Sequence, residues 1–72
     1  MANTFHASVA AEVRAEMGRQ RVTQEQMAAR LGRSREWVRR RTHGAQPFST
    51  DEIEQIAGVL GVPISNFVTP AT

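Results

Sequence analysis

The sequence has 72 residues, a formal net charge of +2 and nine arginines, six of which lie between residues 24 and 44. A chain this short forms one domain, residues 1–72, whose single core serves every element, and the lack of cysteine excludes disulfides and thiolate metal sites. No apolar run approaches the roughly 20 residues of a membrane span and no signal peptide is recognisable, so we expect a cytoplasmic protein, of a cell or of an infected host.

The first predicted element is an amphipathic helix. Residues 1–4 are expected to form a tail. From there apolar residues recur every four positions, which predicts one buried helical stripe: Phe5, Val9, Val13 and Met17. Gly18 weakens a helix interior, so it either marks the final turn or lets another helix approach closely.

The second helix is short and has clear signals at both ends. Thr23 suits the N-cap, and Gln26 at the third helical position completes a capping box. Gly32 is placed as a left-handed C-cap. The residues between them supply a buried face: Met27, Ala28 and Leu31.

The third helix follows after a very short turn. Ser34 is its expected N-cap, and Gly44 is placed to end it. Between these positions lie four arginines. Such a concentration of positive charge is typical of a surface that binds a polyanion, although a solvated arginine face is the alternative.

The rest of the chain predicts two more helices. Ser49 and Glu52 form a second capping box, followed by the apolar positions Ile53, Ile56, Ala57 and Leu60 and by Gly61. Pro63 then opens a short last helix with Ile64 and Phe67. Five short helices without a strand signal predict an all-α bundle.

The segment from about residue 23 to residue 44 resembles the helix-turn-helix of lambda-type phage repressors, Cro proteins and their bacterial relatives (XRE family). The matching positions are Thr23, Gln24, Ala28, Leu31, Gly32, Ser34, Val38 and Gly44. The resemblance continues through the fourth helix and covers about residues 5–68. The WVRRR and PF elements look most like small regulators of actinobacteria and their phages.

Four residues depart from this family pattern. Arg33 replaces a residue that is usually apolar, and Arg41 and Thr42 stand where larger apolar or acidic residues are common. Trp37 is bulkier than the usual occupant. We interpret Trp37 as a packing residue that braces the second helix or stacks with Arg41.

The third helix separates into faces because successive residues are about 100° apart. Val38, Thr42 and Ser34 fall on the inward face, while Arg41 and Trp37 lie on one flank. The outward residues are Arg35, Glu36, Arg39 and Arg40. The resemblance implies that the start of this helix faces base edges, which adds Ser34 to these four. Arginine can donate two hydrogen bonds to guanine. Glu36 either accepts from cytosine or orients Arg40 one turn later.

Phosphate contacts are expected around this helix. The resemblance assigns Gln24 to a backbone phosphate, and the amide groups at a helix N-terminus also favour an anion there. His43 and Arg33 are further phosphate candidates. His6 and His43 have no metal-ligand spacing, and no nucleophile stands with a base, so we expect neither an enzyme nor a cofactor.

The leading hypothesis is a small repressor of the Cro type that binds a double-stranded DNA operator. Specific binding usually needs two copies on neighbouring half-sites, and we expect a weak homodimer through Ile64, Phe67 and Val68, with burial of these residues in the core as the alternative. A second hypothesis is an antitoxin or accessory protein-interaction module. A third is the N-terminal piece of a longer repressor, although the Thr/Pro ending favours a complete chain.

Overall fold

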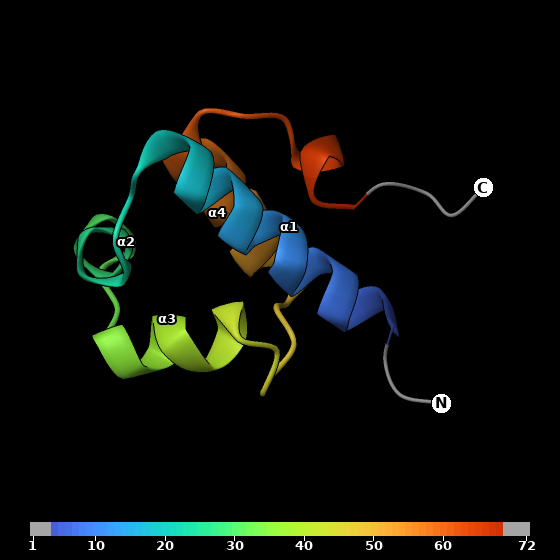
Figure 1. The fold of residues 1–72 in the computed structure, drawn as a ribbon, viewed down its shortest axis with the longest axis horizontal. Helices are drawn as coiled ribbons and strands as arrows, with labels where there is room; N and C mark the ends of the chain where they lie inside the picture. The colour runs from blue at the N-terminus through green and yellow to red at the C-terminus, as the bar shows by residue number, and fades with distance from the viewer. Residues whose placement is uncertain (1–3, 69–72) are drawn as a thin grey trace.

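The computed structural model describes residues 4–68, which are helical without a strand (Figure 1). The elements are α1 (Thr4–Gln20), α2 (Gln24–Leu31), α3 (Arg35–Thr42), α4 (Thr50–Leu60) and the 3-10 helix η1 (Ile64–Asn66). The all-α class is confirmed, with four α-helices in place of the predicted five. The fifth element is a single tight turn, because Phe67 N donates to the carbonyl oxygen of Ile64 three residues earlier, at 2.9 Å.

Helix α1 buries most of its predicted stripe. Val9, Val13 and Met17 are almost fully buried, whereas Phe5 is 54% exposed. The prediction that Phe5 belongs to the buried face is therefore wrong. Phe5 lies in the first turn of α1, where its ring meets the ring of the neighbouring His6 at a centroid distance of 5.7 Å.

The predicted caps are present at both ends of the short helices. Thr23 with Gln26 and Ser49 with Glu52 form complete capping boxes before α2 and α4. Gly32 takes the left-handed conformation with φ 67°, which an L side chain rarely adopts. Because a Cβ on Gly18 would meet no atom within 4 Å, Gly18 marks the final turn of α1 and is not a site of close helix approach.

One core joins all of the elements. Its buried apolar side chains are Val9, Val13, Met17, Val22, Met27, Ala28, Val38, Phe48, Ile53, Ile56, Ala57, Leu60 and Phe67. Phe67 is only 1% exposed, so its predicted place in a dimer interface is wrong and it is a core residue. The chain after Pro63 folds Phe67 back onto α4. Ile64 and Val68 are half-buried against the same core.

Polar contacts join the C-terminal ends of α1 and α4. Gln20 Nε2 donates to the carboxylate of Glu16 and to the carbonyl oxygen of Leu60, both at 2.8 Å. Arg19 also pairs with Glu16, at 2.7 Å between Nη2 and Oε1. The hydrogen bonds from Gln20 and Arg19 lower the pKa of Glu16. The Glu16 carboxylate is therefore held in its charged form.

Replacing Glu16 with glutamine is expected to lower the melting temperature at pH 7, because the amide loses the ion pair with Arg19. A lowered pKa in the folded state means that the unfolded state binds protons more readily. The stabilisation by Glu16 is thus present at neutral pH and is lost as the pH falls through the unfolded-state pKa and then the folded-state pKa. Thermal unfolding at pH 7 and pH 3 should show the difference between wild type and E16Q narrowing in acid.

The matched control for this substitution is Glu54→Gln, which neutralises an exposed carboxylate on α4. Its melting temperature should follow that of the wild type at both pH values. A difference between wild type and E16Q that is as large at pH 3 as at pH 7 would show that packing, and not charge, explains the effect.

Candidate nucleic-acid interface

Helices α2 and α3 are joined by a tight turn at residues 32–34. Arg33 N donates to the carbonyl oxygen of Ala28 at 3.0 Å, which closes the end of α2. Ser34 Oγ accepts from Trp37 N at 3.0 Å, which starts α3. Met27 of α2 and Val38 of α3 are both buried in the same core. These contacts fix the angle at which α3 is held.

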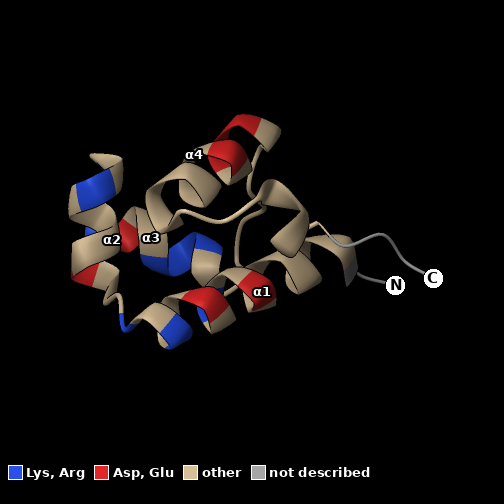
Figure 2. Cartoon of the chain, turned by 90° about the horizontal axis from the view of Figure 1, so that it is seen from above, with Lys and Arg blue, Asp and Glu red and all other residues tan. Residues whose placement is uncertain are grey.

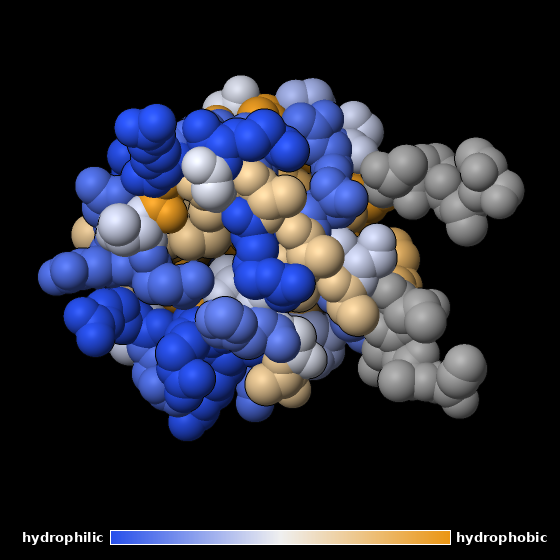
Figure 3. Space-filling model, viewed as in Figure 1, coloured by the Kyte–Doolittle hydropathy of each residue, from blue (hydrophilic) through white to orange (hydrophobic). Residues whose placement is uncertain are grey.

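Helix α3 presents its charged face to solvent, as the helical period predicts. Val38 and Thr42 are each 1% exposed and point into the molecule. The five residues predicted to read base edges are all exposed: Ser34, Arg35, Glu36, Arg39 and Arg40. The inward direction that the helical period gave Ser34 is wrong, because Ser34 is the N-cap and lies outside the helix. Figure 2 shows the arginines concentrated on α3, and Figure 3 shows hydrophilic side chains over α2 and α3.

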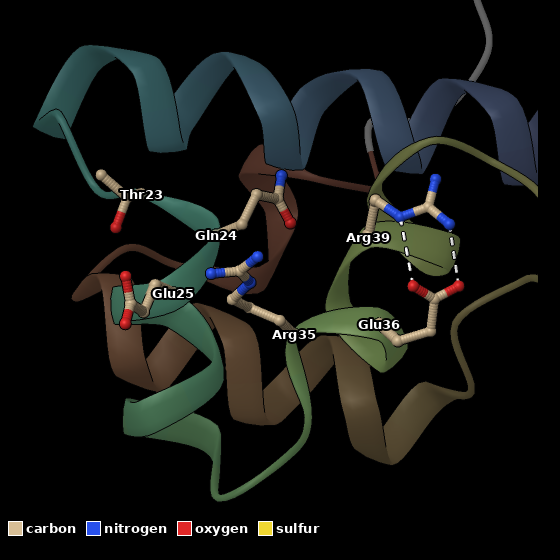
Figure 4. Close-up of a pocket in the computed structure, with 6 residues that line it drawn as sticks. All are labelled: Thr23, Gln24, Glu25, Arg35, Glu36 and Arg39. Atoms are coloured by element: carbon tan, nitrogen blue, oxygen red, sulfur yellow. Dashed lines mark hydrogen bonds and ion pairs between the residues drawn. The ribbon is translucent and has the colours of Figure 1, made fainter.

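A groove of about 580 Å³ separates this face of α3 from the start of α2 (Figure 4). It is lined by Thr23, Gln24, Glu25, Arg35, Glu36 and Arg39. The side chain of Arg35 extends toward Gln24 and Glu25. The sequence analysis did not assign Glu25 to the site, although its place in the first turn of α2, beside Gln24, was a usable signal.

Glu36 is paired with two arginines on its own helix. Arg39 donates through Nε and Nη2 to the two carboxylate oxygens, at 3.3 and 2.8 Å, and Arg40 Nε donates at 3.1 Å. The hydrogen bond from Arg39 is the main cause that lowers the pKa of Glu36. The predicted pair with Arg40 is confirmed, and the pair with Arg39 was not anticipated. Glu36 therefore orients both guanidinium groups.

Gln24 contacts the end of α3. Its Nε2 donates to the hydroxyl of Thr42 at 3.2 Å, and Arg14 of α1 donates to the carbonyl oxygen of Thr42 at 2.6 Å. A buried hydroxyl needs such a partner, which explains how a polar residue occupies this inward position. The assignment of Gln24 to phosphate stays a prediction, and His43 is exposed at the C-cap of α3.

Trp37 is held between charged neighbours on the flank of α3. The guanidinium carbon of Arg41 lies 4.2 Å from the ring centroid, and that of Arg33 lies at 4.6 Å. The prediction that Arg41 stacks with Trp37 is confirmed. Arg33 also stacks on the ring, so the structure places this phosphate candidate in an intramolecular contact.

Residues 4–68 contain no cluster of three histidine, cysteine or acidic side chains that could hold a metal ion. None of the helices in this part of the chain is long and apolar enough to cross a membrane. The arginine face of α3 and the adjoining groove remain the main candidate site.

A comparison with known families agrees with this geometry. A family model described as a helix-turn-helix domain matches residues 8–66, which extend from α1 to the end of η1. No curated protein and no solved structure matches the chain. The match includes the turn between α2 and α3 and the helices that support it, and it confirms the resemblance to the XRE-like domains at the level of the family. The chain therefore belongs to the helix-turn-helix family of DNA-binding domains.

Proposed function

We propose that the protein is a sequence-specific regulator that reads the major groove of double-stranded DNA with α3. The observation that carries the proposal is the outward face of α3, where Arg35, Arg39 and Arg40 are exposed and Glu36 orients two of them. The planar guanidinium group can donate two hydrogen bonds to the O6 and N7 atoms of guanine. Because the opposite face of α3 is buried, the reading face has a fixed direction.

The start of α2 supports the proposal on the other side of the groove. Its first backbone amides and the helix dipole favour an anion at that end. A phosphate of the DNA backbone bound near Gln24 would place base edges next to Arg35 and Arg39, which line the same groove. Ser34 at the start of α3 then contacts a base edge, and His43 at its end contacts a further phosphate.

The finer proposal is a repressor of the Cro type. It acts by occupying an operator and excluding polymerase or another regulator. Because one domain reads only a few base pairs, two copies bind half-sites about 34 Å apart. With Phe67 in the core, the weak contact between copies uses the half-buried side chains of Ile64 and Val68.

Binding-site selection from random duplexes tests the function. The protein should enrich one short sequence with guanine at the positions read by arginine, arranged with two-fold symmetry if two copies bind. A variant carrying Arg35→Ala, Arg39→Ala and Arg40→Ala should keep its helical circular dichroism and enrich nothing. Failure of the wild type to enrich any duplex would overturn the proposal and favour a protein-interaction module such as an antitoxin.

Replacing Gln24 with alanine is expected to weaken binding to the selected operator and to random duplex by the same factor. Loss of one hydrogen bond costs about 1 kcal/mol, which corresponds to roughly fivefold in Kd. A phosphate carries no base identity, so the preference among sequences should not change. Fluorescence anisotropy with both duplexes measures the two losses.

Thr42→Val is the control for this prediction, because it removes the hydroxyl that accepts from Gln24 and keeps the side-chain shape. Direct phosphate contact predicts a larger loss for Q24A than for T42V. A loss confined to one base position of the operator would contradict the phosphate assignment.

A further inference from the structure

Three of the residues that depart from the family pattern meet at the indole ring of Trp37. Trp37 and Arg41 lie on one flank of α3, Arg33 lies in the turn before it, and both arginines stack on the ring. We infer that Trp37 is a positioning residue that sets the orientation of α3 and thereby determines how sharply the protein distinguishes one DNA sequence from another. The inference rests on the proposed function.

Trp37 is linked to the turn that precedes α3. Its ring lies within 4.6 Å of the Arg33 guanidinium carbon, and its backbone N–H donates to Ser34 Oγ at 3.0 Å. A guanidinium group within about 6 Å of an indole centroid is attracted to the ring. Trp37 is thus held to the turn through both its backbone and its side chain. The stack on Trp37 thus gives Arg33 a contact with α3, although the family usually has an apolar residue at this position.

Arg41 links the Trp37 ring to α4. Arg41 also stacks on the indole ring of Trp37, with its guanidinium carbon 4.2 Å from the ring centroid. Its Nε lies 3.5 Å from Glu52 Oε1, and these two side chains are only 17% and 18% exposed. Glu52 Oε1 also accepts from the Ser49 backbone N–H at 2.8 Å. The contacts therefore extend from the turn, along α3, to the start of α4.

This arrangement restrains rotation of α3 about its axis. The reading face and the Trp37 flank belong to the same rigid helix, so any rotation that moves Arg35 and Arg39 relative to the groove must also move Trp37 between its two partners. Bidentate hydrogen bonds to a base depend on direction, whereas attraction to phosphate depends mainly on charge. Loss of Trp37 should consequently affect base reading more than general affinity.

The charges give the inference a distinctive consequence. In the structure Arg33 is engaged by the Trp37 ring. Removal of the ring leaves the positive charge of the exposed Arg33 in place and frees its guanidinium group to turn toward a phosphate. Binding to random DNA should therefore stay constant or strengthen in a variant without Trp37, while binding to the operator weakens.

The test compares Trp37→Leu and Trp37→Phe with the wild type. Each protein is titrated with the selected operator and with random duplex, at a temperature well below its own melting point measured by circular dichroism. W37L should lower the ratio of operator affinity to random-duplex affinity by about tenfold, with no loss of affinity for random duplex. W37F keeps an aromatic face and should recover most of the ratio. Because W37F retains a large apolar ring, it also serves if W37L folds poorly.

Matched variants separate positioning from charge and from stability. Arg33→Ala should lower the ratio, whereas Arg30→Ala, which removes an exposed arginine near the end of α2, should not. Glu52→Gln keeps the capping box, removes the charge facing Arg41 and should lower the ratio by less than W37L. Val62→Ala weakens packing at a half-buried position after α4 and should leave the ratio unchanged.

Two results would overturn the inference. One is a W37L ratio equal to that of the wild type, and the other is an equal loss of affinity for operator and random duplex. Either outcome is distinguishable from failure of the proposed function, because in that case the wild type itself shows no preference for any duplex.

Discussion

Replacing Phe67 with alanine is expected to lower the free energy of unfolding by about 3–5 kcal/mol, as for other buried phenylalanines. Phe67 is one of the largest fully buried side chains, with 1% of its surface exposed. A domain of this size has a total stability of only about 5–15 kcal/mol. The variant should therefore unfold partly at room temperature. Urea denaturation followed by circular dichroism measures the loss.

The same substitution separates the core role of Phe67 from a role in a dimer. Substitution of a core residue lowers the stability by the same amount at every protein concentration. Substitution of an interface residue lowers it by an amount that depends on the protein concentration, because only the dimer is affected. Val59→Ala is the matched control, because Val59 of α4 is half-buried against the same core, and its loss should be much smaller. A loss below about 1 kcal/mol for F67A, together with weaker self-association, would return Phe67 to the interface.

The helix ends were predictable from the sequence because their signals are local. Each capping box joins residues three positions apart, as in Thr23 with Gln26 and Ser49 with Glu52, so the pattern alone specifies both partners. The outward direction of Arg39 follows in the same way from the period of the helix. Such features need no knowledge of how the helices pack.

The contacts between helices could not be predicted from local patterns. Arg14 bonds to the carbonyl oxygen of Thr42, 28 residues away, and Gln20 bonds to that of Leu60, 40 residues away. Helical periodicity placed Phe5 on the stripe of α1, but it could not show that the structure leaves Phe5 exposed in the first turn. Which apolar residues are buried depends on the neighbours that tertiary packing supplies.

Part of the candidate site was predictable from the sequence and part was not. Helical arithmetic placed Arg41 beside Trp37, and the structure confirms the stack. Arg33 lies before the N-cap, where helical angles do not apply, so its contact with the same ring was not foreseen. The phosphate assignment of Arg33 rested on its charge alone. The structure adds a stack on the Trp37 ring, and the phosphate assignment of Arg33 stays a prediction.

Replacing Arg39 with alanine is expected to weaken binding to the operator by about 1–3 kcal/mol and to relax the preference at one base pair. Arg39 is 60% exposed, and two hydrogen bonds to Glu36 hold its guanidinium group in one direction. A base contact from a pre-oriented side chain costs less conformational entropy. Affinities for the operator and for its single-base variants measure both effects.

Arg19 supplies the matched control for Arg39. It is 61% exposed and is paired with a glutamate three residues earlier, as Arg39 is, but it lies at the end of α1. Arg19→Ala removes the same charge and the same kind of ion pair, and it should leave the base preference unchanged. An Arg39→Ala loss that is equal on operator and random duplex would show that Arg39 contacts phosphate. Base reading would then have to come from Arg35 and Arg40, because they are the other arginines on that face.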